Sequence, residues 1–290
     1  MAHGTPSVME EMPEYLRLVR GGRPPSDALV AEMRHNYAAI GGRSPLTDLT
    51  RAQAEALAAA LGDGTRVYVG MRNWKPFIAE AIEAARADGF TELVAVPMAP
   101  QYSTLSVGKY RAAVDTAATL HGVTVRFVHA WHDHPGLLGA FAERLREALG
   151  RGTRDAVLFT AHSLPQRVIA EGDPYAGQVA ATAKGVAERA GVASYGLAYQ
   201  SAGRTPEPWL GPSLDEALMS LAAAGNKRVL VAPIGFVCDH TEILFDVDVQ
   251  AAAVARKNGL DLIRSESLNC SPAFIAALAD VVRSHRAAPR

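Results

Sequence analysis

The sequence predicts an α/β fold in which parallel sheets are flanked by helices. Short apolar runs of strand length alternate with longer amphipathic segments along nearly all of the 290 residues. Several of these runs are continuously apolar, which is typical of strands buried on both faces. Polar residues follow two of the runs, on the side where open α/β sheets place their ligand sites.

The individual elements follow from this alternation. The predicted strands are apolar runs bounded by turn residues: residues 66–70, 92–97, 123–128, 156–161, 194–199, 228–233 and 260–263. The predicted helices have apolar residues at helical spacing: residues 10–19, 27–40, 51–61, 75–87, 106–120, 136–149, 178–190, 213–224, 242–257 and 272–285. The regular succession of the two kinds of element favours parallel sheets covered by helices.

Composition excludes several classes of protein. Hydrophobic residues make up 49% and charged residues 20%, which fits a soluble globular protein. A net charge of -1 gives no basic surface for nucleic acid, and no apolar stretch is long enough to cross a bilayer. Residues 1–6 lack the features of a signal peptide. Cys238 and Cys270 form no CxxC pair, which indicates a reducing cytoplasm and argues against an iron–sulfur cluster.

The candidate site lies after two of the predicted strands. Glu242 and Asp246 follow the run at 228–233 and share one face of the next helix, because they are four residues apart. His162 follows the run at 156–161. A histidine at one strand end and a glutamate at another could face each other across a cleft.

A short internal repeat divides the chain. Residues 2–6 and residues 161–165 both have the pattern Ala-His-x-x-Pro, and the second copy ends a predicted strand. We therefore expect two similar lobes, residues 1–150 and residues 151–290, with the C-terminal helix packing back on the first. The strand that should precede the first copy is absent from the given sequence, which suggests a truncation or a misplaced start.

Taken together, these segments resemble the ferrochelatase family, the ATP-independent class II chelatases that insert ferrous iron into porphyrins. The resemblance is carried by residues 3–6, 37–46, 163–165, 172–175, 200–201, 206–212 and 233–248. It implies a chelatase-like fold of two Rossmann-like lobes around a porphyrin cleft, and it implies no nucleotide.

The resemblance implies that His162 and Glu242 are the catalytic pair at the metal-insertion site, on the second lobe. A porphyrin loses two pyrrole protons as the metal enters; imidazole can accept a proton or ligate iron, and a carboxylate can take the other proton. Asp246 is a further candidate metal ligand. Gln250 stands where many relatives carry an acidic residue, and the family often has a widened π-type turn in this helix.

The resemblance also implies porphyrin-binding residues, whose arginine and hydroxyl groups suit propionate carboxylates. These are His3, as a contact to the product iron, together with Thr5, Arg20, Arg23, Arg43, Ser44 and Tyr110. We expect Asp239 to cap the helix that carries Glu242, and His240 to lie behind the catalytic pair.

The expected function is that of a lyase of haem biosynthesis, a cytoplasmic ferrochelatase that converts coproporphyrin III to coproheme. The sequence has no added membrane-binding tail, and the segment around residues 13–25 is mixed rather than strongly apolar. Two alternatives remain open: a protoporphyrin IX ferrochelatase that gives protoheme, and a carrier that binds tetrapyrrole or metal without turnover. A cobalt chelatase ranks lower, because such relatives lack the Pro-Glu-Pro-Trp-Leu-Gly-Pro pattern.

The expected partners are the porphyrin and ferrous iron, which is a substrate, so no cofactor is required for turnover. We expect a monomer with transient contacts to neighbouring haem-pathway enzymes. We expect no nucleic acid partner and no transmembrane segment.

Overall fold

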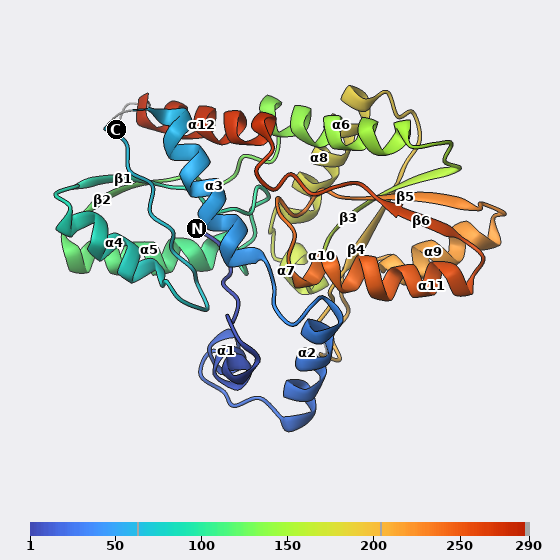
Figure 1. The fold of residues 1–290 in the computed structure, drawn as a ribbon, viewed down its shortest axis with the longest axis horizontal. Coiled ribbons are helices and arrows are strands. Elements are labelled where there is room, and N and C mark those ends of the chain that lie inside the picture. The colour runs from blue at the N-terminus through green and yellow to red at the C-terminus, as the bar shows by residue number, and fades with distance from the viewer. Residues whose placement is uncertain (63, 204, 288–290) are drawn as a thin grey trace. The chain divides into compact units, whose positions relative to one another are not determined.

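The structure is a computed structural model that describes residues 1–62, 64–203 and 205–287 (Figure 1). Contacts divide it into two compact units. Unit 1 contains residues 1–99, 104–129 and the chain from Leu278 on, and unit 2 contains residues 100–103 and 130–277. These bounds differ from those of the lobes expected from the sequence, and the lobe division stays a prediction. Within unit 1, the C-terminal helix contacts earlier residues, since the Arg283 guanidinium donates to the Ala60 carbonyl over 2.7 Å.

Unit 1 is built around a short parallel sheet. Its strands are β1 (Glu92–Ala95) and β2 (Thr124–Phe127), with Glu92 opposite Thr124. Its helical elements are η1 (Met9–Glu11), α1 (Met12–Val19), α2 (Asp27–Ala39), α3 (Leu46–Leu61), α4 (Ile78–Ala87), α5 (Val107–His121) and the last part of α12 (Pro272–Ala287). Helices α4 and α5 pack beside each other (Figure 1).

The strand predicted at residues 66–70 is wrong as an assignment of secondary structure. These residues are extended, but they pair with no strand in the described part of the chain. The apolar alternation there is real, yet a strand exists only where a neighbour supplies hydrogen bonds along its length. Among the described residues, such a bond is made only at the end of the segment, where the Ala2 amide donates to the Gly70 carbonyl.

Unit 2 contains a four-stranded parallel sheet in the order β4-β3-β5-β6. The strands are β3 (Ala156–His162), β4 (Gly196–Gln200), β5 (Arg228–Pro233) and β6 (Asp261–Arg264). The helices are α6 (Pro135–Gly150), α7 (Gln166–Ala170), α8 (Tyr175–Ala190), α9 (Leu214–Ala223), α10 (Thr241–Leu244) and α11 (Ala252–Lys257), with the π-helix η2 (Asp246–Ala251). The six strands predicted between residues 92 and 263 are confirmed to within a few residues, whereas the short α7 was not predicted.

Helices cover both faces of the unit 2 sheet. In Figure 1, α6 and α8 lie on one side of the sheet and α9 and α11 on the other. The core on the α9 and α11 side contains Leu158, Leu218, Val231 and Val247, all of them buried. The five residues of β3 between its ends are fully buried, which explains why this strand has a continuous apolar sequence.

The helix predicted over residues 242–257 is interrupted in its first half. The amides of Val249 and Gln250 both donate to the Phe245 carbonyl, over 3.1 and 2.9 Å, and the second of these bonds is the i→i+5 bond of a π-helix. The widened turn that the resemblance implied is therefore present. It lies directly after α10 and carries Asp246.

Candidate functional site

The candidate site of unit 2 is built on strand ends. His162 is the last residue of β3, and it is in register with Gln200, the last residue of β4. After β5 the chain stays close to β3, because the amides of Ile234 and Gly235 both donate to the Thr160 carbonyl. A Cβ atom at Gly235 would lie 2.7 Å from the Ala161 Cβ. Only glycine allows this approach, which positions the following segment beside His162.

The carboxylate of Glu242 lies between two imidazole rings. Its Oε1 is 3.7 Å from Nε2 of His162, and its Oε2 is 3.6 Å from Nε2 of His240. The Nδ1 atoms of the two rings contact the carbonyls of Ser163 and Cys238. A carbonyl can only accept a hydrogen bond, so the Nδ1 atom of each ring carries a proton. The Nε2 atom of each ring is the one that faces Glu242.

Polar side chains from the sheet hold this arrangement. Thr160 Oγ1 donates to Gln200 Oε1 over 2.8 Å, and Gln200 Nε2 donates to the backbone carbonyl of Glu242. The Tyr175 hydroxyl donates to the His162 carbonyl over 3.0 Å. The backbone on both sides of the imidazole–carboxylate contact is thus fixed by groups that are themselves hydrogen-bonded.

Burial and charge shift the protonation of the neighbouring groups. Burial alone would lower the pKa of His240, but the hydrogen bond and negative charge of Glu242 outweigh it, and the pKa is raised. Burial, together with the charge of Glu242, raises the pKa of Asp246 to about 6, although a hydrogen bond from Ser201 opposes the rise. A carboxyl with this pKa exchanges protons near neutral pH.

Ser201 reaches Asp246 from an unusual backbone conformation. Its φ is 59°, in the left-handed region that disfavours side chains, and its Oγ donates to Asp246 Oδ2. Strained residues of this kind cluster at functional sites. Ser201 and its neighbour Gln200 were recognised in the sequence only as part of a motif, without a role. Their position directly after a strand was the signal that could have identified them.

Asp239 does not cap α10, contrary to expectation. Its carboxylate instead accepts hydrogen bonds from Ser267 Oγ over 2.7 Å and Asn269 Nδ2 over 2.9 Å, and it pairs with Arg264 at 3.2 Å. The residue before α10 is His240, which makes no side-chain cap. Asp239 therefore holds the loop after β5 against the loop after β6.

The structure does not test the predicted ligand set of His162, Glu242 and Asp246. Among the residues that are described, no group of three or more histidine, cysteine, aspartate or glutamate side chains is arranged to hold a metal ion together. The three assignments stay predictions.

In unit 1, both ring nitrogens of His3 make hydrogen-bond contacts. Its Nε2 accepts from Asn73 Nδ2 over 2.9 Å, and its Nδ1 lies 3.2 Å from the Gly4 carbonyl and 3.3 Å from the Tyr15 hydroxyl. Because Nδ1 donates to the carbonyl, the lone pair of Nε2 is used by the Asn73 amide. Nε2 of His3 could bind iron only if its hydrogen bond from Asn73 were broken.

A cavity of about 270 Å³ in unit 1 gathers three of the predicted porphyrin-binding residues, Thr5, Arg43 and Ser44. Two cationic residues that the sequence did not single out, Arg51 and Lys75, also line it. Also in the lining is Thr47, whose buried Oγ1 has no hydrogen-bond partner among the described residues. The lining also contains the carboxylates of Asp48 and Glu80, and Arg43 pairs with Asp48 at 3.0 Å. The cationic side chains are suited to a carboxylate, in competition with these two acidic residues.

The remaining predicted residues lie outside the lining of this cavity. Arg20 and Arg23 are exposed after α1, and the Arg23 side chain donates to the Arg20 carbonyl. Tyr110 is buried, with the Arg72 guanidinium 5.7 Å from its ring centre. Thr5, which does line the cavity, is buried, and its hydroxyl oxygen is 2.7 Å from that of Tyr37. None of these roles is tested by the structure.

Comparison with known proteins agrees with the resemblance seen in the sequence. The sequence profile described as Ferrochelatase matches residues 1–286. The chain is 45% identical to a ferrochelatase of Deinococcus radiodurans, over 97% of this chain and 93% of that protein. It is 38% identical to a coproporphyrin III ferrochelatase of a Geobacillus species, over 97% of this chain and 95% of that protein.

The fold is also found among solved structures. SirB from Bacillus subtilis, solved with Fe3+, has a TM-score of 0.64 at 16% identity, over 83% of this chain and 89% of that one. This likeness shows a chelatase-like α/β fold.

No helix in the part of the chain that the structure describes has the length and apolar character needed to span a membrane. With a profile that matches nearly the whole sequence and relatives at 38–45% identity, the chain belongs to the ferrochelatase family.

Proposed function

We propose that this ferrochelatase inserts ferrous iron into coproporphyrin III to give coproheme, and that the cluster around Glu242 removes the pyrrole protons. The observation that carries the proposal is the position of one carboxylate between two imidazole Nε2 atoms, at 3.7 and 3.6 Å. A carboxylate beside two imidazoles suits a reaction that must remove two protons from its substrate.

The proton balance fits the groups present. Free porphyrin carries two N–H protons, and the product carries none, so each insertion of Fe2+ releases two protons. The Nε2 lone pair of His162 accepts one of them, because Nδ1 of this ring already carries a proton. The Glu242 carboxylate accepts the other. Until Glu242 takes up its own proton, its negative charge stabilises the imidazolium that forms at His162.

Asp246 extends this arrangement away from the strand ends. Its pKa of about 6 lets it take up a proton and release it again at neutral pH. His240, whose pKa is raised by Glu242, provides a second neighbouring acceptor. We assign to these two groups the return of protons to solvent, which resets His162 and Glu242 for the next turnover.

Three observations support coproporphyrin III as the substrate. One relative at 38% identity is a coproporphyrin III ferrochelatase. Within the described residues 8–25, the exposed large apolar side chains are Val8 and Val19, which form no extended apolar patch. Coproporphyrin III carries four propionates, so it is soluble and does not need delivery from a membrane. The cavity of unit 1 contains Arg43, Arg51 and Lys75, which suit a propionate, and it also contains the acidic residues Asp48 and Glu80.

We further propose that turnover needs only the porphyrin and ferrous iron, and that the enzyme works as a cytoplasmic monomer. The near-neutral net charge of -1 and the lack of a membrane-spanning helix in the described residues are compatible with this setting. Light scattering from the purified protein during turnover measures its molar mass and so tests whether it is a monomer.

The test is anaerobic insertion of Fe2+ into coproporphyrin III and into protoporphyrin IX, side by side, followed by absorbance. We expect the larger kcat/KM with coproporphyrin III. A larger value with protoporphyrin IX would contradict the substrate assignment while keeping the enzyme class. Stoichiometric haem binding without insertion into either porphyrin would favour a carrier.

A further inference from the structure

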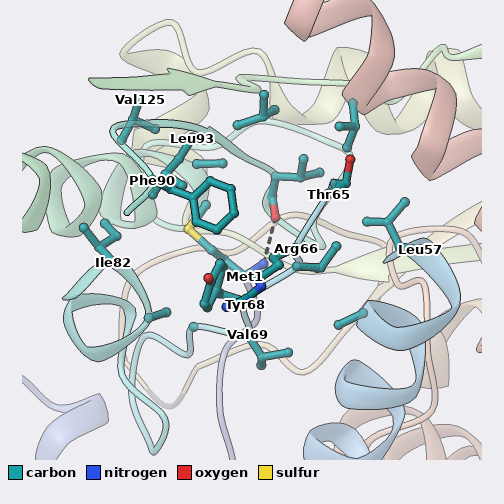
Figure 2. Close-up of a pocket in the computed structure, with 18 of the residues that line it drawn as sticks. Met1, Leu57, Thr65, Arg66, Tyr68, Val69, Ile82, Phe90, Leu93 and Val125 are labelled. Atoms are coloured by element: carbon teal, nitrogen blue, oxygen red, sulfur yellow. Dashed lines mark hydrogen bonds between the residues drawn. The ribbon is translucent and has the colours of Figure 1, made fainter. Parts of the chain in front are cut away.

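The groups that could act on the reaction differ between the two units. In unit 1, the cavity shown in Figure 2 has a volume of about 390 Å³, and apolar side chains such as those of Leu57, Ile82 and Phe90 line much of it. Hydrocarbon side chains offer neither a proton acceptor nor a ligand for iron. In unit 2, a guanidinium that has no part in the cluster around Glu242, that of Arg264, binds both ends of the segment that carries this glutamate.

The Arg264 guanidinium binds two carboxylates at the same time. Its Nε and Nη2 atoms donate to the two oxygens of Asp248 over 2.7 and 3.0 Å, which is the bidentate geometry of a guanidinium with a carboxylate. Its Nη1 atom lies 3.2 Å from Oδ1 of Asp239 and donates to Ser267 Oγ over 3.3 Å. One planar group therefore fixes the positions of both aspartates.

These two aspartates are the ends of the segment that carries the proposed proton acceptors. Asp239 comes directly before His240, Glu242 lies on α10, and Asp248 follows Asp246 within the π-helix η2. Helix α10 has only four residues, and a π-helix is rarely stable on its own. The conformation of residues 239–248 therefore depends on contacts with the rest of unit 2.

The sheet of unit 2 gives the guanidinium a fixed base. Arg264 is the last residue of β6 and is in register with Val231 of the inner strand β5. The amide of the next residue, Ser265, donates to the Val231 carbonyl over 2.9 Å. The Arg264 side chain is only 14% exposed, and its Nη1 atom also donates to the Ser265 carbonyl over 3.2 Å. The two aspartates are thus held relative to the sheet rather than only to each other.

Charge keeps these contacts intact in a largely buried place. Burial alone would lower the pKa of Arg264, but the hydrogen bonds and charges of Asp248 and Asp239 outweigh it, and the pKa is raised. The guanidinium is therefore charged throughout the pH range in which the protein is folded. Its five N–H groups in one plane can serve both carboxylates, which the single ammonium of a lysine cannot do in the same geometry.

We propose that Arg264 is a positioning residue for the proton transfer at Glu242, and that it acts by holding both ends of residues 239–248 at the end of β6. The inference rests on the proposed function, since it takes Glu242 as a proton acceptor. Arg264 acts through Asp239 and Asp248 and not by contact with the reacting atoms.

The middle of the same segment is held from the other side of the sheet. Gln200 Nε2 donates to the Glu242 carbonyl, and Ser201 Oγ donates to Asp246. With its ends and its middle both fixed, the segment holds the Glu242 carboxylate at 3.7 Å from His162. A displacement of about 1 Å in a reacting group can lower a rate by about 10²-fold, so release of the two ends should reduce turnover.

The test uses one variant on each side of the contact. Arg264→Lys keeps the positive charge but loses the planar fork. Asp248→Asn removes one carboxylate charge at a side chain that is 36% exposed, so this variant should fold even if Arg264→Lys does not. We expect kcat for iron insertion into coproporphyrin III to fall by about ten-fold or more in each variant, with KM for the porphyrin within about two-fold of wild type. The double variant should lose no more than about two-fold beyond Arg264→Lys, because both changes break the same contact.

Arg228→Lys is the matched control. Arg228 is the first residue of β5, and its guanidinium binds the carboxylate of Asp155 at 2.8 Å, at the opposite end of the strand from the candidate site. This control should keep kcat within about two-fold of wild type. Amide hydrogen exchange adds a measurement without porphyrin or iron. The Gln250 amide, which donates to the Phe245 carbonyl over 2.9 Å, should exchange about ten-fold faster in Arg264→Lys and Asp248→Asn but not in Arg228→Lys.

A folded Arg264→Lys or Asp248→Asn protein that keeps the wild-type kcat, or the wild-type exchange at Gln250, would overturn the proposal. So would an equal loss of kcat in Arg228→Lys, or a double variant whose loss is the product of the two single losses. Glu242→Gln, measured beside them, separates this inference from the proposed reaction. A low kcat in Glu242→Gln with a wild-type kcat in Arg264→Lys rejects only the role of Arg264, whereas a wild-type kcat in Glu242→Gln rejects the proposed proton transfer itself.

Discussion

His162 in unit 2 and His3 in unit 1 occupy the same place in a repeated motif, but their partners differ in charge. Nε2 of His162 faces the Glu242 carboxylate at 3.7 Å, whereas Nε2 of His3 accepts from the Asn73 amide at 2.9 Å. A carboxylate stabilises a protonated imidazole. An amide N–H bonds only to the unprotonated nitrogen, so it favours the neutral ring. The comparison therefore supports the proposal that protons are accepted in unit 2.

The sheets of the two units differ in a related way. In β3 of unit 2, the residues between the ends are all buried, whereas β1 of unit 1 has one exposed and three partly exposed residues. Burial on both faces follows from having a strand on each side and helices above and below. In unit 2 the candidate site thus lies at the end of a strand that is paired on both sides.

The largest expected effect separates the two histidines. We expect His162→Ala to lower kcat for iron insertion by about 10²–10⁴-fold, the range associated with loss of a positioned acid or base. His3→Ala should lower kcat by less than about ten-fold, since the Nε2 lone pair of His3 is already used by the Asn73 amide. Steady-state insertion kinetics of both variants check this, with porphyrin binding measured by fluorescence quenching. Equal losses in the two variants would remove the distinction between the units.

The pH dependence of the insertion rate in Asp246→Asn tests the proton transfer proposed for unit 2. We expect the acid limb of the wild-type rate, near the pKa of about 6, to be lost in this variant, because the carboxyl that titrates there is gone. Rates measured from pH 5 to pH 8 test this. An acid limb that persists unchanged would assign that titration to another group.

Asp246→Asn should also make the folded protein more stable at pH 7. Because folding raises the pKa of Asp246, the native state binds more protons, and its stability falls as the pH rises through the window from about 4 to about 6. Asp246→Asn removes this loss, so we expect it to stabilise the fold by about 1–3 kcal/mol at pH 7 and to have little effect below pH 4. Urea unfolding at both pH values measures the difference. A gain at pH 4 equal to that at pH 7 would contradict the raised pKa.

Gly235→Ala tests how the loop after β5 is held beside β3. The added methyl would lie 2.7 Å from the Ala161 Cβ, so we expect a loss of stability of about 1–3 kcal/mol together with reduced turnover. Gly177→Ala is the matched control, because no atom lies within 4 Å of a Cβ at that helical position. The control should stabilise slightly, as alanine does in a helix. Similar thermal melts for the two variants would show that the close approach is unimportant.

The smallest expected effect is spectroscopic. Glu242→Gln removes the charge that raises the pKa of His240, so this pKa should fall in the variant. Titration of the His240 ring by NMR follows it directly. Glu207→Gln, which removes a carboxylate that pairs with Arg167 instead, should leave the His240 titration unchanged. An unchanged titration in Glu242→Gln would mean that the contact at 3.6 Å is not maintained in solution.

Much of the fold could be predicted because it depends on local pattern. The apolar runs of β3 and β5 are buried in the structure, and their ends carry or precede the site residues, as strand order in α/β sheets requires. The extended residues 66–70 could not be assigned, because pairing depends on a distant neighbour rather than on their own sequence. The same limit applies to α10 and η2, where the resemblance, rather than periodicity, indicated the π-type turn.

The site was predictable in part for a similar reason. The pair His162 and Glu242 follows from strand ends and from the resemblance, and the two side chains do lie together. The contribution of Gln200 could not be predicted, since its amide acts on a backbone carbonyl 42 residues away. Lys75 and Arg51 join Arg43 only through the tertiary fold of unit 1.

The most direct measurement is the rate of iron insertion into coproporphyrin III by Glu242→Gln, with porphyrin affinity and thermal stability measured on the same preparation. Glutamine keeps the size of the side chain and removes its ability to accept a proton. We expect kcat to fall by at least about 10²-fold while porphyrin affinity and Tm stay close to those of the wild type. A variant that folds, binds porphyrin and inserts iron at nearly the wild-type rate would contradict the central claim that Glu242 and its two imidazoles carry the proton transfer.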